Sequence, residues 1–215
     1  MSEEITPREF HEAEGVDDWR VLGDGASARF RTRSFAKGVQ LVDAIGVLAD
    51  TANHHPDVDL RFGAVTVRLF THEVLGLTTA DVELARRISA AARDLGLEAD
   101  PAGVQDVYVA IDALVGPEVR PFWRAVLGYR EVGDELVDPD ARWPSVWFQQ
   151  MDVPRAQRNR IHVDVFVPHD QAEARVAAAI EAGGRLVSDE NAPALWTLAD
   201  AEGNEVDVAT WVGRD

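Results

Sequence analysis

Residues 53–72 read NHHPDVDLRFGAVTVRLFTH, and this stretch decides the fold of the first half of the chain. Pro56 disfavours the helical conformation for the residue before it, so any preceding helix must end near Asn53. Beyond the proline, apolar and polar residues alternate on both sides of Gly63. Alternation with a period of two is typical of half-buried strands. The stretch therefore predicts two strands joined by a tight turn at that glycine.

Helical patterns lie on both sides of this strand pair. Apolar residues recur with a period of about 3.6 from residue 35 to residue 52, which predicts a helix with one buried face. That expected face consists of Phe35, Val39, Val42, Ile45 and Ala49. After the strands, Thr78 caps a second helix that runs to about Leu95, with Asp81 at the capping-box position. With two more strands expected within 19–33, the first half is predicted to be an α+β domain, an antiparallel sheet with helices on one face.

The second half of the chain contains a weak internal repeat. Leu97–Gly103 breaks the periodicity and is the expected linker, so the predicted domains are 1–98 and 104–215. Asp112–Gly128 and Pro168–Gly184 are equally long, and each spans the helical part of a strand–helix–strand pattern that ends in further strands. A duplicated β-α-β-β-β unit explains this layout better than one irregular domain.

Composition excludes several classes of protein. Hydrophobic residues make up 46% of the 215 residues and charged residues 27%, as in ordinary soluble proteins. The absence of cysteine excludes disulfides, thiolate metal sites and a cysteine nucleophile. A net charge of −17 argues against nucleic acid and anionic membranes as partners, because both need clustered Lys and Arg. The acidic start, residues 1–4, lacks the basic and apolar regions of a signal peptide, so we expect a cytoplasmic protein.

Three of the six histidines, His54, His55 and His72, lie in the stretch quoted above. Imidazole is the side chain best suited to proton transfer near neutral pH, so the group predicts acid–base chemistry on a small molecule in a pocket at one end of the sheet. Two other interpretations stay open. The histidines are surface or capping residues, or they bind zinc with Asp57 or Asp81 as a fourth ligand, although no recognised metal spacing is present.

A series of motifs runs in fixed order through residues 17–95. They are Trp19, Phe30, Phe35, Asn53-His54-His55-Pro56-Asp57, Val65-Thr66-Val67-Arg68-Leu69, Thr71-His72, Gly76-Leu77-Thr78 and Asp81. With these motifs, this part of the chain resembles the pterin-4a-carbinolamine dehydratase family. The resemblance implies that a 4a-hydroxytetrahydropterin loses water to give a quinonoid dihydropterin, with no metal or redox cofactor. It also implies a homo-oligomer, a dimer or a tetramer.

The resemblance assigns roles to individual residues. It implies catalytic roles for His54, His55 and His72, of which the first and last transfer protons and His55 mainly holds the pterin. The implied substrate-binding residues are Asp57, Thr71 and Asp81, the last of which orients or binds. Two positions depart from the family pattern: Leu75 stands where the family usually has glycine, and Asp50 where it often has glutamate. Members of the family also serve as non-catalytic dimerising or assembly scaffolds, which is the alternative function.

Residues 104–213 resemble the glyoxalase/bleomycin-resistance (vicinal oxygen chelate) superfamily, in its glyoxalase-like branch. The motifs that carry this are Ile111-Asp112, the segment 120–129, the segment 159–164 and the segment 200–205. Metal-binding members use four strand-borne ligands, for which His162 and Asp207 are weak candidates here. The repeat places Asp106 opposite His162, and Gln149 or Gln150 would have to complete the set. We therefore expect a small-molecule-binding domain, with a metal-dependent enzyme as the alternative.

Overall fold

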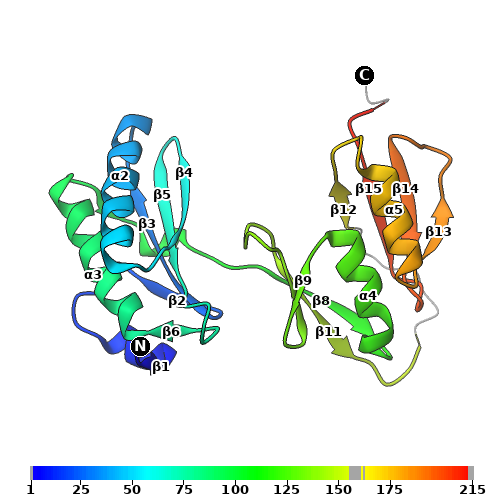
Figure 1. Cartoon of the computed structure of the whole chain (residues 1–215), viewed down its shortest axis with the longest axis horizontal. Helices are drawn as coiled ribbons and strands as arrows, with labels where there is room; N and C mark the ends of the chain where they lie inside the picture. The colour runs from blue at the N-terminus through cyan, green and yellow to red at the C-terminus, as the bar shows by residue number, and fades with distance from the viewer. Residues whose placement is uncertain (1, 155–160, 162, 213–215) are drawn as a thin grey trace. The chain divides into compact units, whose positions relative to one another are not determined.

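The computed structural model describes residues 2–154, 161 and 163–212. The chain divides into two compact units, Met1–Asp106 and Val107–Asp215 (Figure 1). Among the described helices, none combines the length and the apolarity that crossing a bilayer demands.

The first unit is built around a five-stranded antiparallel sheet. Its elements are β1 (Glu4–Ile5), α1 (Pro7–Glu12), β2 (Arg20–Leu22), β3 (Gly25–Arg31), α2 (Phe35–Ala52), β4 (Asp57–Arg61), β5 (Ala64–Leu69), β6 (Leu77–Thr78), α3 (Thr79–Asp94), β7 (Glu98–Ala99) and the 3-10 helix η1 (Pro101–Gly103). The strand order is β2-β3-β5-β4, β7 pairs with β3, and β1 and β6 form a separate pair. The predicted strand pair around Gly63 is present, with Leu60 opposite Val65.

The core of the first unit lies between one face of the sheet and the two long helices. The buried side chains of β3 and β5 are Ala26, Ala28, Phe30, Val65, Val67 and Leu69. Leu41 and Ile45 of α2 and Leu84 and Ile88 of α3 join this cluster. Figure 1 shows α2 and α3 side by side. The predicted α+β fold with helices on one face of the sheet is thus confirmed.

The buried face of α2 differs from the predicted one. The helix has the predicted bounds, but Phe35 is 50% exposed and Val39 is 39% exposed. Its buried residues are Gly38, Leu41, Ile45 and Ala49. A Cβ on Gly38 would lie 2.4 Å from Cδ1 of Leu60, so the missing side chain lets α2 approach β4 closely. Ile45 and Ala49 are buried as predicted. The prediction was wrong for the start of the helix because it gave no weight to a glycine as a contact residue.

The expected linker is part of the first unit. Residues 98–99 form β7, which pairs with Phe30 and Arg31 of β3. Asp100 then accepts hydrogen bonds from the guanidinium groups of Arg29 and Arg31, and its own N–H donates to the carbonyl of Arg29. These contacts give structure to a segment whose composition alone is typical of a loop.

The second unit contains two four-stranded sheets with the same connectivity. Its elements are β8 (Tyr108–Ala113), α4 (Gly116–Leu127), β9 (Arg130–Val132), β10 (Glu135–Val137), β11 (Ser145–Gln150), β12 (Asp164–Phe166), α5 (Ala172–Glu181), β13 (Arg185–Ser188), β14 (Leu195–Ala199) and β15 (Glu205–Ala209). The sheet orders are β8-β11-β10-β9 and β12-β15-β14-β13, and the first pair in each is parallel. The predicted duplicated β-α-β-β-β unit is therefore confirmed, with β10 as a strand that the sequence analysis did not identify.

A buried carboxylate organises the core of the second unit. Asp200 is fully buried and accepts hydrogen bonds from the indole N–H of Trp123, 3.0 Å away, and from the backbone N–H groups of Glu202 and Asn204. The carboxylate of Glu202 in turn accepts from the N–H groups of residues 114 and 115, at 2.7 Å each. The turn at residues 200–204 in the second repeat thus holds residues 114–115, which lead into α4 of the first repeat.

Candidate active site

His54 lies where α2 ends and the chain turns toward β4. The helix is capped by Asn53, whose φ of 49° is left-handed, and the N–H of His54 closes the last turn on the carbonyl of Ala49. This cap directs the imidazole toward the start of α3. There Nε2 of His54 lies 2.7 Å from Oδ1 of Asp81. The histidine side chain is 14% exposed and the aspartate side chain is fully buried.

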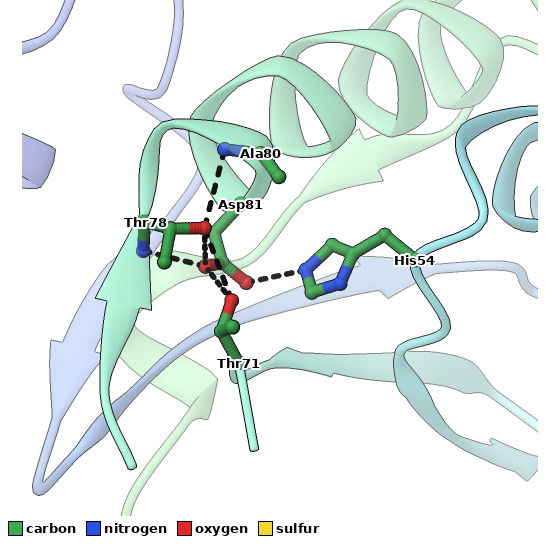
Figure 2. Close-up of polar contacts among 5 residues, drawn as sticks. All are labelled: His54, Thr71, Thr78, Ala80 and Asp81. Carbon is green, nitrogen blue, oxygen red and sulfur yellow. Dashed lines mark hydrogen bonds and ion pairs between the residues drawn. The ribbon is translucent and has the colours of Figure 1, made fainter. Parts of the chain in front are cut away.

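The carboxylate of Asp81 is held from two sides (Figure 2). Its Oδ1 faces His54, and its Oδ2 accepts from the hydroxyl of Thr71 and from the backbone N–H of Thr78, each at 2.7 Å. The hydroxyl of Thr78 lies 3.0 Å from the same oxygen and accepts from the N–H of Ala80. The predicted capping box at the start of α3 therefore also fixes the partner of a histidine.

These contacts shift the pKa of both partners. Burial opposes ionisation of Asp81, but hydrogen bonds from His54, Thr71 and the N–H of Thr78 outweigh it, so the pKa of Asp81 is lowered. The hydrogen bond to Asp81 raises the pKa of His54, against the effect of burial, and the charge of Glu73 adds to the rise. Nε2 of His54 is consequently the nitrogen that carries a proton toward the carboxylate. Figure 2 shows the other ring nitrogen directed away from Asp81.

His55 pairs with a different carboxylate. Adjacent residues of an extended segment point to opposite sides, and Nε2 of His55 lies 3.1 Å from Oδ1 of Asp50 in the last turn of α2. Both side chains are mostly exposed, at 62% and 83%. Solvent weakens such a pair, so it orients His55 without holding it rigidly.

His72 lies in the turn between β5 and β6, and its side chain is exposed. Its ring packs edge-to-face on that of Phe70, with centroids 5.1 Å apart. The guanidinium of Arg68 lies over the same phenyl ring, and Arg68 also lies 3.7 Å from a carboxylate oxygen of Asp57. Asp57 is thereby placed on the outer face of the sheet, in contact with Arg68.

The structure thus brings together three of the predicted site residues, His54, Asp81 and Thr71, by direct contact. His55 directly follows His54 in the chain, but it contacts Asp50 instead. His72 directly follows Thr71, but its contact is with Phe70. Sequence reasoning identified Thr78 only as a helix cap and Asp50 only as a departure from the family pattern. The position of Asp50, close to one turn before the paired histidines, is the signal that could have pointed to a partner for His55.

The proposed metal ligands of the second unit do not form a site in the part of the chain that is described. His162 lies outside the described residues. Asp207 accepts a hydrogen bond from the hydroxyl of Thr197 at 2.6 Å, and the amide of Gln150 donates to backbone carbonyls. Within residues 2–154, 161 and 163–212, no three His, Asp or Glu side chains are arranged to hold a metal ion. From these described residues, no metal site is assigned to the second unit.

Comparisons with known proteins agree with this division of the chain. A family model described as pterin 4 alpha carbinolamine dehydratase matches residues 3–91, and one described as a glyoxalase-like domain matches residues 108–209. The two matched segments fall within the two compact units.

Individual proteins are similar to one part of the chain or the other. A protein of Nocardia farcinica named "Putative pterin-4-alpha-carbinolamine dehydratase" is 42% identical over 78 residues, which cover 36% of this chain and 82% of the relative. A structure of a transcriptional coactivator/pterin dehydratase from Brucella melitensis is 26% identical, with 41% of this chain and 98% of that chain covered and a TM-score of 0.39. A glyoxalase/bleomycin resistance protein/dioxygenase family enzyme from Burkholderia phytofirmans is 17% identical, with coverage of 48% and 95% and a TM-score of 0.36. The chain belongs to the pterin-4a-carbinolamine dehydratase family through its first unit, and its second unit is a glyoxalase-like domain.

Proposed function

We propose that the first unit is a 4a-hydroxytetrahydropterin dehydratase that works by histidine acid–base catalysis. Family membership supports dehydratase activity. The observation that carries the proposal for this chain is the hydrogen bond between His54 and the buried carboxylate of Asp81. A structural histidine on a protein surface needs no such partner, whereas a proton-transfer group needs a defined tautomer and a pKa suited to its task.

His54 is proposed as the acid. Loss of water breaks the C4a–O bond of the pterin carbinolamine, and the departing hydroxyl needs a proton. Because Asp81 raises the pKa of His54 above its ordinary 6.5, the imidazolium form persists to higher pH than in a free histidine. Its Nε2–H stays bound to Asp81 while Nδ1 delivers a proton to the hydroxyl oxygen. The ring is left as the neutral tautomer that the carboxylate prefers, so no reorganisation is needed.

His72 is proposed as the base. As the C4a–O bond breaks, N5 of the pterin loses its proton to the exposed imidazole of His72 and the N5=C4a double bond of the quinonoid dihydropterin forms. His72 then releases its proton to solvent, and His54 takes one up from solvent, which completes the cycle. His55 holds the pterin, and Asp57 binds it from the side of the sheet. The reaction moves protons and water only, so the proposed mechanism includes neither a redox cofactor nor a metal.

The test is a dehydration assay on a pterin 4a-carbinolamine, with the rate measured above the spontaneous reaction. We expect His54→Ala and His72→Ala each to lower the rate by roughly 10²–10⁴-fold, the usual range for a lost acid or base. The control is His11→Ala, an exposed histidine of α1 outside the site, which should retain the wild-type rate. Circular dichroism on each variant checks that the fold is intact.

Two outcomes would contradict the proposal. Wild-type rates in both histidine variants would show that these imidazoles do not transfer protons. A folded wild-type chain without turnover would instead favour the scaffold function. The expected homo-oligomer is measured on the same sample by analytical ultracentrifugation.

For the second unit we propose small-molecule binding. Stoichiometric divalent metal in the purified protein would favour a metal-dependent enzyme there.

A further inference from the structure

Three histidines of the first unit, His54, His55 and His72, are held in different ways. His54 and His55 each have a carboxylate partner. His72 has no hydrogen-bond partner in the described part of the chain, and its contact is with the ring of Phe70, edge-to-face at 5.1 Å. An exposed imidazole without a polar partner would exchange freely between rotamers, so the phenyl ring is the feature that restricts it.

Phe70 is itself confined. It is 8% exposed although it lies beyond the end of β5, because Arg68 covers it with the guanidinium 4.9 Å from the ring centroid. Arg68 lies in β5, Phe70 directly follows the strand and His72 lies in the turn beyond it. The two ring contacts bring these side chains together in that order. The arrangement is a stack of a cation, an aromatic ring and an imidazole.

Arg68 is held from several elements. Its guanidinium pairs with Asp24 in the β2–β3 turn and lies 3.7 Å from Asp57 at the start of β4. Gly25 leaves room for it, since a Cβ there would lie 3.1 Å from Nε of Arg68. Asp106 at the end of the first unit is also close. Burial raises the pKa of that carboxyl and the charge of Arg68 counteracts the rise. The arginine is therefore anchored, which makes it a fixed support for the phenyl ring.

We propose that Phe70 and Arg68 are positioning residues for His72. The aromatic contact orients the imidazole of His72, as the hydrogen bond with Asp81 orients that of His54. The inference rests on the proposed function of His72 as a proton acceptor. Catalysis by a positioned base requires the reacting atoms within hydrogen-bond reach, and small displacements lower the rate steeply. Neither side chain contacts the substrate in this proposal, so both act on turnover through the imidazole.

The experiment uses the full chain with two matched pairs of variants. Phe70→Leu removes the ring and Phe70→Tyr retains it. Arg68→Gln removes the charge and Arg68→Lys retains it. The control is Phe148→Leu, because Phe148 in the second unit lies under Arg120 at 5.8 Å and offers the same kind of contact away from the site.

Two readouts are measured for each variant. The first is the NMR chemical shift of the His72 ring protons, which the ring current of Phe70 displaces. We expect Phe70→Leu to move these signals toward those of a free histidine and Phe70→Tyr to preserve them. The second is the split between kcat and KM. We expect kcat to fall by about 10-fold or more in Phe70→Leu with KM nearly unchanged, because misplacement of the base affects proton transfer rather than binding. In Arg68→Gln we expect a smaller fall in kcat.

Each result decides the inference. Unchanged His72 signals together with an unchanged kcat in Phe70→Leu would overturn it, as would an equal loss in Phe148→Leu. Phe70→Tyr and the arginine variants keep the test valid if Phe70→Leu fails to fold. If the wild-type chain has no dehydratase activity, the proposed function fails. The NMR signals then still decide whether Phe70 holds His72.

Discussion

Replacement of Asp81 by asparagine tests the central contact of the site. The change retains size and shape but removes the charge that His54 faces. The amide oxygen still accepts from Thr71 and Thr78, so the new NH₂ group must point at Nε2 of His54. An NH₂ group donates, which forces Nε2 to become an acceptor and moves the ring proton to Nδ1. The histidine is then neutral and in the wrong tautomer to act as an imidazolium acid.

The size of the effect follows from the same contacts. For activity, loss of a functional acid lowers the rate by roughly 10²–10⁴-fold. For stability, three or more hydrogen bonds to a charged oxygen become neutral ones, which costs about 2–3 kcal/mol in the free energy of unfolding. The pKa of His54 falls, because burial still acts on the imidazole while the carboxylate no longer does.

The assays are the rate of carbinolamine dehydration, urea unfolding followed by fluorescence, and NMR titration of His54. The matched control is Asp59→Asn, which removes a carboxylate from a half-exposed ion pair with Arg61 on β4 and should change stability by less than about 1 kcal/mol. A variant Asp81→Asn with an unaltered pKa of His54 and a rate within threefold of the wild type would refute the role given to this carboxylate.

Two further predictions concern pH and the second unit. The pKa of His54 is raised above its ordinary 6.5, so its stabilising contribution is complete below that pH and is lost as pH rises through the raised value. The pKa of Asp81 is lowered below 3.8, so its contribution is present above that pH and is lost as pH falls through the lowered value. In a pH series of urea titrations, the free energy of unfolding of the wild type should therefore decrease in both of these pH ranges. That of Asp81→Asn should show neither decrease. Asp200→Ala leaves the indole of Trp123 and two backbone donors without their acceptor, and should destabilise the second unit by about 3 kcal/mol or more. Wild-type stability of this variant in urea unfolding would contradict the role given to the carboxylate.

Local patterns predicted the secondary structure of the first unit well. Pro56 and the alternation around Gly63 located the end of α2 and the two strands that follow, because both signals act within a few residues of the chain. The buried face of α2 was predicted wrongly at the start of the helix, because the contact with Leu60 depends on a residue that packs by having no side chain. Periodicity counts apolar side chains and gives such a glycine no weight.

The candidate site, too, could be predicted only in part from local sequence patterns. Histidines beside a proline, and Asp81 three residues after a capping threonine, were identifiable from residue type and spacing. Their pairing was not, because His54 and Asp81 are 27 positions apart and meet only when α2 and α3 pack on the same sheet. The stack of Arg68, Phe70 and His72 consists of near neighbours, but the alternation alone gives no sign that the guanidinium lies over the ring.

The sequence by itself determined the helices and most of the strands, the duplicated pattern of the second half and the residue types available for proton transfer, because these depend on short-range sterics and on side-chain chemistry. Only the tertiary structure decided which carboxylate His54 and His55 each face. For His54 it thereby also decided which ring nitrogen carries the proton and in which direction the pKa moves. The physical reason is that hydrogen bonds and burial act over a few ångströms in space. Packing of the whole unit, rather than distance along the chain, sets those separations.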